Sequence, residues 1–475
     1  MTTKDLYTLF LKHPVISTDT RKIEAGSIFF ALKGDKFDAN TFAKTAIESG
    51  AAYVVIDNHD FKFGEKYILV NDSLQALQDL ARYHRQQLNI PVFGLTGSNG
   101  KTTTKELIFS VLSQKYKTLA TQGNLNNHIG VPLTILSINA THQMAVIEMG
   151  ANHQKEIEFL CSISLPTHGL ITNVGKAHLE GFGGVEGVKK GKGELYDYLK
   201  KSESRNPDSY RDRKSESKED AGVAFVNSDS ADLIKMQADR HLKNVVFYGT
   251  GGNNNLVYGH LTENSPYLSL NWVNTKSGQS QTIKTQLTGA YNLDNILAAI
   301  CVAAYFGLSD EEINQGVESY EPKNNRSQIV RTATNTLICD YYNANPSSML
   351  VAIENMDKIE ANHKVLILGD MFELGEEAAA EHLAIAQKAM ATNAEKIIFV
   401  GKEFAKVGES MVHDPWSSPL LELSPTNGNA PDRRIAFFQT TEDASLAIKI
   451  NPIKNSAVLI KGSRGMALER LVELF

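Results

Sequence analysis

The segment with the clearest chemical signature is Gly94-Leu-Thr-Gly-Ser-Asn-Gly-Lys-Thr-Thr-Thr, between a predicted buried strand and a predicted helix. Small residues in such a turn let backbone N–H groups close around phosphate oxygens, and the start of the helix adds partial positive charge. Lys101 would then reach the terminal phosphates, and the Thr102 hydroxyl would bind Mg²⁺. The usual pattern has glycine five residues before Gly100, where this chain has Leu95. Because strand and helix flank the turn, the segment predicts a nucleoside triphosphate site.

Three other polar residues follow predicted strands or begin predicted helices. Glu148 ends a buried strand, where a carboxylate needs a cation; Mg²⁺ is the expected one, and a salt bridge to lysine is the alternative. His178 either ligates a second metal ion or is a structural hydrogen-bonding residue. Lys192, in Gly191-Lys-Gly-Glu-Leu, is expected at a helix start, where an ammonium group is unfavourable. Its position hints at a modified or anion-bound lysine.

The elements that must position these residues form three predicted α/β units, at residues 1–88, 89–322 and 323–475. The first is small, the second contains the phosphate-loop motif, and the third has five evenly spaced strand candidates without such a motif. Strands that alternate with helices imply crossover connections and mostly parallel sheets. Ligands of these sheets bind at the carboxyl ends of the strands, where the polar motifs lie. The predicted class is therefore α/β, with a central ATPase-type sheet and a Rossmann-like, doubly wound C-terminal unit.

Residues 201–220 interrupt this pattern, since they are rich in serine and charge and contain no aliphatic side chain. Such a segment cannot bury enough apolar surface to offset its ordering entropy. We predict an exposed, disordered insertion.

Composition limits the remaining function classes. Lys plus Arg total 48 against 54 Asp plus Glu, so a net charge of −6 disfavours sequence-independent DNA binding. Cys161, Cys301 and Cys339 are far apart and lack metal-ligand spacing, which predicts reduced core thiols in a cytoplasmic protein. The longest apolar run, 296–308, is shorter than the roughly 20 residues that span a bilayer, and we find no signal peptide. The chain is expected to be soluble.

Taken together, the motifs resemble those of the Mur ligase family, from Asp19 to the C-terminus apart from 201–220. The family-wide features are Thr96-Gly-Ser-Asn-Gly-Lys-Thr-Thr-Thr, Glu148, Ala177-His178, Lys192-Gly-Glu and the helix start Gly289-Ala-Tyr-Asn-Leu-Asp-Asn. The features similar to the member that adds D-alanyl-D-alanine are Asn124-Leu-Asn-Asn-His-Ile-Gly-Val-Pro, Tyr342-Asn-Ala-Asn-Pro-Ser-Ser-Met, Leu368-Gly-Asp-Met-Phe-Glu-Leu-Gly and Lys461-Gly-Ser-Arg.

The resemblance implies an ATP-dependent ligase that joins D-alanyl-D-alanine to UDP-N-acetylmuramoyl-tripeptide in peptidoglycan synthesis. ATP would convert the tripeptide carboxylate into an acyl phosphate, which the dipeptide amine attacks, giving the pentapeptide, ADP and phosphate. The first unit would bind the UDP-sugar-peptide, the second ATP and the third the dipeptide. The resemblance also implies two Mg²⁺ ions and a carbamylated Lys192, because an ammonium group cannot ligate a metal. It implies a monomer that binds small molecules, without nucleic acid or membrane insertion.

The same resemblance assigns individual residues. The catalytic residues would be Lys101, Glu148, His178 and Lys192, and the metal ligands Thr102, Glu148, His178 and Lys192. The ATP-binding residues would be Thr96, Gly97, Ser98, Asn99, Gly100, Lys101, Thr102, Thr103, Asn292, Asn295, Arg326 and Asp340. The residues for the other substrates would be Thr20, Arg21, Ser27, Asn124, Asn127, Asn343, Asn345 and Lys461. Asn343 and Asn345 have an alternative role as caps of the following helix, which Pro346 supports.

Some positions depart from the family pattern. Asp38-Ala39-Asn40 replaces Asp-Gly-His, which bears on the uridine contacts, and Asn325, Cys339 and Leu468 replace a glycine, an acid and a methionine. A sibling Mur ligase or a folylpolyglutamate synthase would share the phosphate loop. The tripeptide-forming sibling should also have an Asp-Asn-Pro-Arg segment, which is missing here. A non-catalytic protein gated by nucleotide is the alternative from another class.

Overall fold

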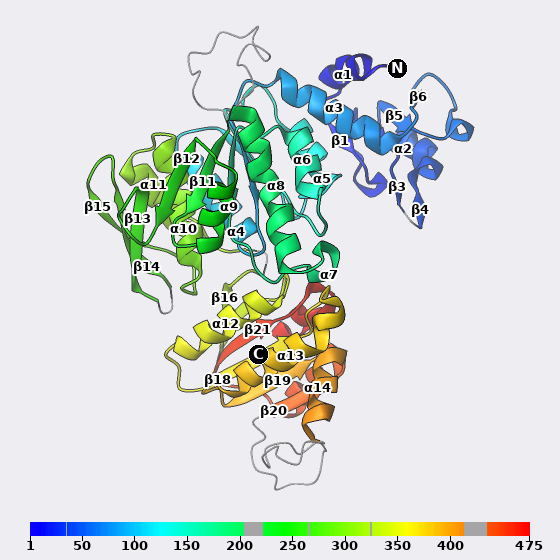
Figure 1. Ribbon diagram of the computed structural model, residues 1–475. Helices are drawn as coiled ribbons and strands as arrows, with labels where there is room; N and C mark the ends of the chain where they lie inside the picture. Colours follow the sequence, from blue (N-terminus) through cyan, green and yellow to red (C-terminus); the bar gives the residue numbers. More distant parts are fainter. Residues whose placement is uncertain (35, 204–221, 265–266, 324, 413–434) are drawn as a thin grey trace.

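Three α/β units, each built on its own sheet, make up the protein (Figure 1). The computed structural model describes residues 1–34, 36–203, 222–264, 267–323, 325–412 and 435–475. The predicted α/β class is confirmed, whereas the exact boundaries at 88/89 and 322/323 stay predictions. Most of the predicted insertion lies outside the described residues. Its first three residues, 201–203, belong to the end of a long helix instead, so the insertion cannot begin at Lys201.

The N-terminal unit, blue in Figure 1, has a parallel sheet in the order β1-β2-β5-β6 and a separate β3–β4 hairpin. Its strands are β1 Ile16–Ser17, β2 Ile28–Phe30, β3 Lys33–Gly34, β4 Phe37–Asp38, β5 Tyr53–Ile56 and β6 Tyr67–Leu69. Its helices are α1 Thr3–Lys12, α2 Ala43–Glu48 and α3 Ser73–Gln87, with short 3₁₀ turns η1 Thr20–Lys22, η2 Ala39–Phe42 and η3 His59–Phe61. Helix α3 buries Leu77 and Leu80 in the same apolar cluster as central-unit helices, so it joins the two units.

The central unit is a nine-stranded sheet in the order β15-β14-β13-β12-β11-β10-β7-β9-β8. Its strands are β7 Val92–Thr96, β8 Thr118–Ala120, β9 Met144–Glu148, β10 His168–Ile171, β11 Val223–Asn227, β12 Val245–Gly249, β13 Asn255–Glu263, β14 Ser269–Asn274 and β15 Ser280–Lys284. Strands β7 to β13 are all parallel to one another, and β14 and β15 extend the sheet as antiparallel strands. Strand β7, which precedes the phosphate-loop motif, is buried along its whole length.

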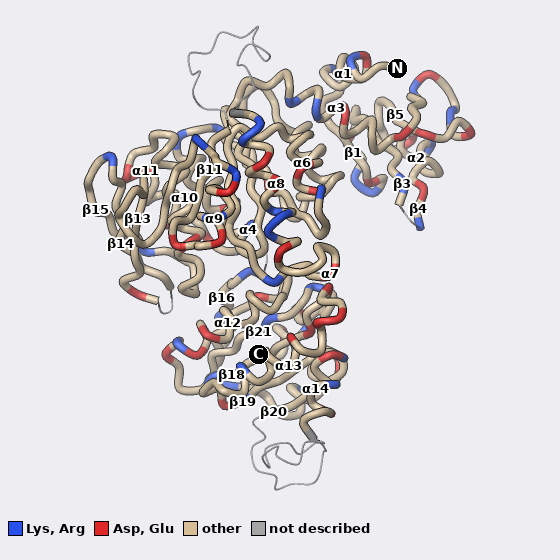
Figure 2. The backbone as a smooth tube through the Cα atoms, in the orientation of Figure 1, with Lys and Arg blue, Asp and Glu red and all other residues tan. Residues whose placement is uncertain are grey.

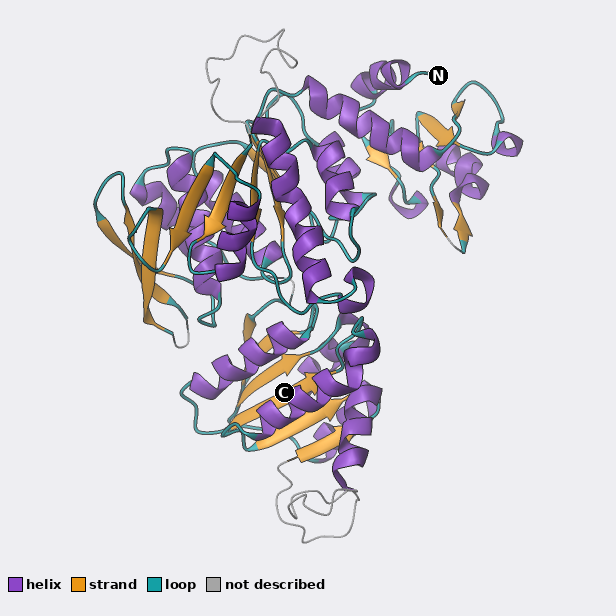
Figure 3. Ribbon diagram, viewed as in Figure 1, coloured by secondary structure: helices purple, strands orange, loops and turns teal. Residues whose placement is uncertain are grey.

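Helices cover both faces of the central sheet (Figure 3). They are α4 Lys101–Leu112, α5 Gly130–Leu136, α6 Glu156–Ser164, α7 Leu179–Phe182, α8 Val185–Glu203, α9 Ala231–Asp239, α10 Asn292–Tyr305 and α11 Asp310–Glu318. One face packs against α5, α6 and α8, and the other against α4, α10 and α11. Helix α10 contains most of the longest apolar run and is buried nearly throughout. Within the described ranges, no helix is both long and apolar enough to cross a membrane.

The C-terminal unit, yellow to red in Figure 1, has a six-stranded sheet in the order β16-β17-β21-β18-β19-β20. Its strands are β16 Gln328–Arg331, β17 Thr336–Asp340, β18 Lys364–Gly369, β19 Lys396–Val400, β20 Ile435–Phe438 and β21 Ala457–Lys461. Its helices are α12 Pro346–Lys358, α13 Ala378–Met390, α14 Lys402–Val412 and α15 Thr441–Ile450, with 3₁₀ turns η5 Gly375–Glu377, η6 Arg464–Met466 and η7 Leu468–Leu474. Separate apolar clusters on the two faces make it doubly wound.

The three cysteines are buried and form no disulfide, as expected of core thiols. The five strands predicted for the C-terminal unit are confirmed as β17, β18, β19, β20 and β21. Among the described strands of this sheet, only the edge strand β16 is antiparallel.

His168, the first residue of β10, makes the central unit sensitive to acid. Its ring packs against Phe306 and Tyr305, and burial lowers its pKa to about 3. The unfolded chain protonates this imidazole near pH 6.5, whereas the folded chain does not until about pH 3. We therefore expect stability to fall by about 1.4 kcal/mol per pH unit over that window from this group. His168→Phe should melt at a temperature that changes less than that of the wild type between pH 7.5 and 5. Equal acid sensitivity of the two proteins would contradict this prediction.

Candidate active site

The phosphate-loop motif has the strand–turn–helix geometry that its sequence predicts. Strand β7 ends at Thr96, and α4 begins at Lys101 after a turn that includes Gly97 and Gly100. Gly97 has a φ of +149°, and a Cβ there would lie 1.9 Å from the Thr172 hydroxyl oxygen. A side chain at this position would both strain the backbone and collide with the neighbouring strand. Glycine is therefore required for the loop to lie close to the end of β10.

Side chains that follow β10 hold this loop in place. The Asn99 N–H donates to Asn173 Oδ1 at 3.0 Å, and the Thr172 hydroxyl donates to the Asn99 carbonyl at 2.6 Å. The Ser98 hydroxyl and the Gly175 backbone form two further hydrogen bonds. These bonds fix the backbone of the loop before any ligand binds, which lowers the conformational cost of binding an anion.

Lys101 lies across the mouth of the loop. Its Nζ donates to the carbonyl oxygens of Gly97 at 2.7 Å and Ser98 at 3.0 Å. Burial lowers the pKa of Lys101 to about 8; the charge of Glu148 opposes this shift and that of Arg326 adds to it. A phosphate group would supply the negative charge that this ammonium lacks among its described contacts.

Glu148, the last residue of β9, is a buried carboxylate beside the phosphate loop. Its Oε1 accepts from Asn126 Nδ2 at 2.9 Å and from the Thr102 hydroxyl at 3.2 Å. Its Oε2 is buried and has no donor among the residues that the structure describes. A buried carboxylate oxygen without a donor is costly unless a cation is nearby. The pair Thr102 and Glu148 therefore fits a hard cation such as Mg²⁺.

Lys192 does not lie at a helix start, and the prediction on this point was wrong. It lies in the middle of α8, on the buried side of the helix, because the helix already begins at Val185. The helix-dipole argument therefore does not apply, but a different anomaly replaces it. The side chain is 1% exposed, and its Nζ donates to the Ala151 carbonyl at 2.9 Å and lies 4.9 Å from the Phe182 ring centroid.

This buried amine has no ion pair with any carboxylate of the described ranges. Burial, reinforced by the charge of Lys101, holds the pKa of Lys192 well below its usual value. A lowered pKa shifts the equilibrium of this group towards the neutral amine, which is the nucleophilic form.

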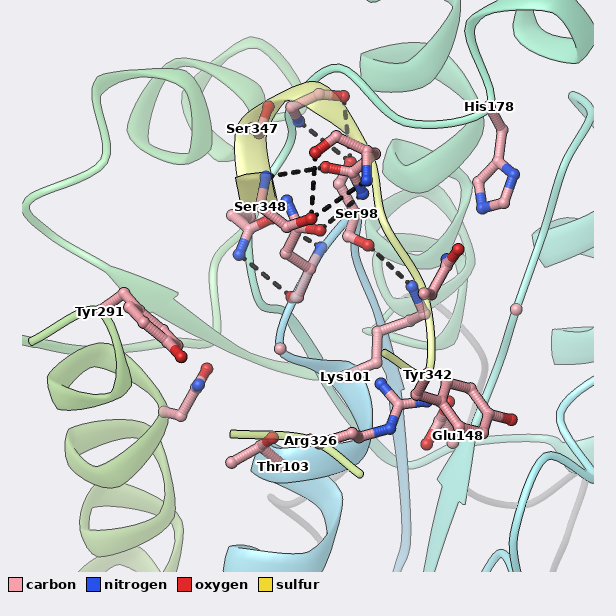
Figure 4. A pocket seen from close by; sticks show the side chains of 18 of the residues that line it. Ser98, Lys101, Thr103, Glu148, His178, Tyr291, Arg326, Tyr342, Ser347 and Ser348 are labelled. Atoms are coloured by element: carbon pink, nitrogen blue, oxygen red, sulfur yellow. Dashed lines mark hydrogen bonds between the residues drawn. The ribbon is translucent and has the colours of Figure 1, made fainter. Parts of the chain in front are cut away.

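His178 precedes the short helix α7 and adopts a left-handed conformation, with a φ of 53°. Its Nδ1 forms a hydrogen bond with the carboxylate of Glu373, which comes from the C-terminal unit. The imidazole lowers the pKa of that carboxyl group. Figure 4 shows that the His178 ring points into the cavity that Lys101 and Glu148 also line.

The C-terminal unit contributes Arg326, a cationic residue, to the wall of the cavity that also contains Lys101 and Glu148. The Arg326 guanidinium lies 3.9 Å from the centre of the Tyr342 ring, and its buried Nε has no partner in the described part of the chain. Lys461 donates to Asp340 at 2.6 Å. Of the two asparagines that the alternative reading predicted as caps, Asn345 caps α12, whereas Asn343 Oδ1 accepts from the Ala344 N–H. The Asn345 Nδ2 also donates to Asn99 Oδ1 at 2.7 Å, which ties the cap to the phosphate loop.

Helix α10 forms the remaining side. It begins at Asn292, within the helix start that the family resemblance implied for residues 289–295, and Asn295 donates to Asn292 Oδ1 at 2.8 Å. The Asn295 side chain also packs against Gly100, so the helix start abuts the phosphate loop. The Tyr291 hydroxyl forms a hydrogen bond with the Ser327 hydroxyl of the C-terminal unit.

These walls enclose a cavity of about 660 Å³ at the junction of the central and C-terminal units. Sixteen of the predicted site residues line it: Ser98, Asn99, Gly100, Lys101, Thr103, Asn124, Asn127, Glu148, His178, Asn292, Asn295, Arg326, Asp340, Asn343, Asn345 and Lys461. Thr96 ends β7, Gly97 belongs to the loop itself and Thr102 lies in the first turn of α4, while Lys192 contacts the cavity wall through the Ala151 carbonyl. Figure 2 shows basic and acidic positions mixed over all three units, this junction included.

Three predicted residues lie apart from this cavity, in the N-terminal unit. Thr20 and Arg21 belong to η1, where Arg21 pairs with Asp19 at 2.8 Å, and Ser27 is buried before β2. Asn40 of the departing Asp38-Ala39-Asn40 segment is fully buried and donates to Asp38 and Asp57 at 2.7 Å each. Asn40 therefore forms hydrogen bonds with carboxylates of its own unit, Asp38 and Asp57.

Sequence reasoning assigned no role to several residues of the cavity wall. They are Asn126, Asn173, Tyr291, Tyr342 and Ser347. Each lies inside or beside a motif that was recognised, so proximity to the motif was the available signal. Their partners could not be identified because the hydrogen bonds of Asn126 and Asn173 cross from one strand end to another.

Comparison with known proteins agrees with this architecture. The model of the Mur ligase middle domain matches residues 95–303, that of the Mur ligase glutamate ligase domain residues 325–464, and that of the Mur ligase family catalytic domain residues 14–85. The UDP-N-acetylmuramoyl-tripeptide–D-alanyl-D-alanine ligase of Bacillus subtilis (strain 168) is 32% identical over 462 residues, covering 96% of this chain and 92% of the relative.

Solved structures are similar over the whole length. A crystal structure of MurF from Acinetobacter baumannii has a TM-score of 0.81 and 28% identity, covering 99% of this chain and 98% of that one. MurF of Thermotoga maritima, solved with ADP, has a TM-score of 0.78 and 25% identity, covering 98% and 97%. This chain therefore belongs to the Mur ligase family of ATP-dependent ligases.

Proposed function

We propose that this enzyme joins D-alanyl-D-alanine to UDP-N-acetylmuramoyl-tripeptide with cleavage of ATP to ADP and phosphate. The observation that carries the proposal is the junction cavity, in which a phosphate loop faces the Arg326 and Lys461 wall of another unit. Relatives named for this activity match nearly the full chain at about 32% identity, which supports it over a sibling ligase.

The reaction must overcome two barriers, and the cavity offers groups suited to both. A carboxylate is a poor acyl donor until phosphorylation replaces its oxide leaving group with phosphate. Transfer of a phosphoryl group between anions requires concentrated positive charge, which Lys101 and Arg326 supply. The amine of the dipeptide then attacks the acyl phosphate, and Lys461, Asn343 and Asn345 are the candidates for binding the dipeptide.

Two Mg²⁺ ions would neutralise phosphate charge in this cavity. The first would be held by Thr102 and Glu148, consistent with the donor-free Oε2 of Glu148. The second would be held by His178 and by Lys192 as its carbamate. Formation of a carbamate joins the amine nitrogen to CO₂ with loss of a proton, and it requires the neutral amine that burial of Lys192 favours.

The remaining predicted residues fall into two groups under this proposal. Thr96 to Thr103, Asn292, Asn295, Arg326 and Asp340 would bind ATP, with the two asparagines nearest the adenine. Thr20, Arg21 and Ser27 of the N-terminal unit would bind the UDP end, while Asn124 and Asn127 would approach the peptide end of that substrate. We further propose that units 1–88, 89–322 and 323–475 divide these tasks in a cytoplasmic monomer.

Phosphate release tests this function directly. The purified chain should release phosphate from ATP only when both UDP-N-acetylmuramoyl-tripeptide and D-alanyl-D-alanine are present, with pentapeptide formed in equal amount by mass spectrometry. One arm omits the dipeptide and another replaces it with D-glutamate. Release that is independent of the dipeptide would contradict the proposal, and nucleotide binding without any turnover would favour a nucleotide-gated binding protein.

A further inference from the structure

The contact between His178 and Glu373 joins two units of the protein through residues 195 positions apart. His178 lies in the loop after β10, and Glu373 lies in the loop between β18 and η5. The imidazole is 20% exposed and the carboxylate 55% exposed, so the pair lies at the rim of the cavity rather than in a core. Neither core packing nor a shared element explains why these two side chains meet.

Both partners have unusual backbones. The φ of His178 is 53° and that of Glu373 is 62°, in the left-handed region that residues other than glycine seldom adopt. Glutamate gains nothing locally from this conformation, whereas asparagine or glycine would adopt it at lower cost. Such strain persists only where the surroundings impose it, and it is concentrated at functional sites.

The loop before Glu373 is held residue by residue to three different elements. The Asp370 carboxylate accepts the N–H groups of Glu403 and Phe404 at 3.0 Å each. The Met371 N–H donates to His382 Nε2 at 3.0 Å, and the Phe372 N–H donates to the Ser463 hydroxyl at 3.1 Å. These bonds fix the direction in which the next residue leaves the loop, so Glu373 is presented to His178 by a rigid support.

We propose that Glu373 is a positioning residue for His178: its carboxylate fixes the imidazole as the Nδ1–H tautomer and leaves Nε2 free to bind the second metal ion. A carboxylate can only accept a hydrogen bond, so Nδ1 must donate, and in a neutral imidazole the lone pair is then on Nε2. Histidine ligands of metals usually donate their other N–H to a carboxylate in this way. This inference rests on the proposed function, which assigns a metal to His178.

Because the carboxylate comes from the C-terminal unit, the second metal site would be complete only when that unit is docked. Other contacts accompany the docked arrangement. Lys176 pairs with Glu381 at 2.5 Å, and Gly375 packs against the Glu180 side chain. Glu381 provides a matched control, since it makes an ion pair across the same interface without touching His178.

The test combines a spectroscopic and a binding measurement on the full chain. Long-range ¹H–¹⁵N NMR of histidine-labelled protein, with the His178 signals assigned through His178→Ala, should show the Nδ1–H form in the wild type. Glu373→Ala and Glu373→Asn should both populate the Nε2–H form. Mn²⁺ affinity with ADP present, followed by electron paramagnetic resonance of free Mn²⁺, should fall about 10-fold or more in both variants, approaching that of His178→Ala.

The variants separate positioning from stability. Asparagine suits a left-handed backbone, so Glu373→Asn should melt no lower than the wild type while still losing Mn²⁺ affinity. Glu381→Gln should keep both the tautomer and the Mn²⁺ affinity within about twofold. Unchanged His178 tautomers in both Glu373 variants, or equal losses of affinity in Glu381→Gln, would overturn the inference. A wild type that binds no Mn²⁺ with ADP would instead contradict the proposed metal site, while the tautomer measurement would still test Glu373.

Discussion

Lys192→Ala is expected to lower substrate-dependent phosphate release by at least about 100-fold, and added acetate or bicarbonate should restore part of that rate. The reason is the environment of the Lys192 side chain, which is 1% exposed and whose amine donates a hydrogen bond to the Ala151 carbonyl. Within the described residues, this amine forms no ion pair. If the working form is a carbamate that ligates a metal, a small carboxylate can enter the space left by truncation and supply the missing oxygen. The measurement is the initial rate of phosphate release as a function of acid concentration.

Two further variants make the Lys192 test specific. Lys192→Met fills nearly the same volume, so it should fold and remain inactive with or without added acid. Lys190→Ala, two positions away on the exposed side of α8, should keep the wild-type rate. The carbamate hypothesis fails if Lys192→Ala retains the wild-type rate without any added acid.

Lys101→Met should reduce the same rate by about 10³-fold, because it removes the cation aimed at the transferring phosphate. Its ammonium lies over the loop on the carbonyl groups of Gly97 and Ser98. Since burial lowers the pKa of Lys101 to about 8, the group loses its charge as the pH rises through that value. ATP affinity of the wild type should therefore weaken above about pH 8, and Lys101→Met should lack this dependence.

Lys105 is the matched control for Lys101, because it is a buried lysine one turn further along α4. Its Nζ donates to the Thr121 carbonyl and to Glu106, both at 2.6 Å, and it does not line the cavity. Lys105→Met should lower the melting temperature while the rate per folded molecule stays near the wild-type value. A Lys101→Met enzyme that turns over as fast as Lys105→Met would contradict the assigned role.

The sequence by itself determined the features that depend on neighbouring residues. The buried run before Thr96, the small residues up to Gly100 and the helix after them specify the phosphate loop, because backbone conformation and side-chain periodicity are local properties. The cap at Asn345 followed in the same way, whereas the start of α10 near Asn292 was implied only by the family resemblance. The alternation of strands and helices was enough for the α/β class.

Tertiary structure alone decided the features that depend on distant partners. Local signals placed Lys192 at a helix start. In the folded chain, α8 begins seven residues earlier, and its packing against the sheet buries the Lys192 side chain. The pairing of His178 with Glu373 joins residues 195 positions apart, and that of Asn345 with Asn99 joins residues 246 positions apart. No local pattern encodes such contacts, because they depend on how whole units dock. The local sequence is thus enough to predict the phosphate loop, whereas the cavity around it forms only when the units of the folded chain dock.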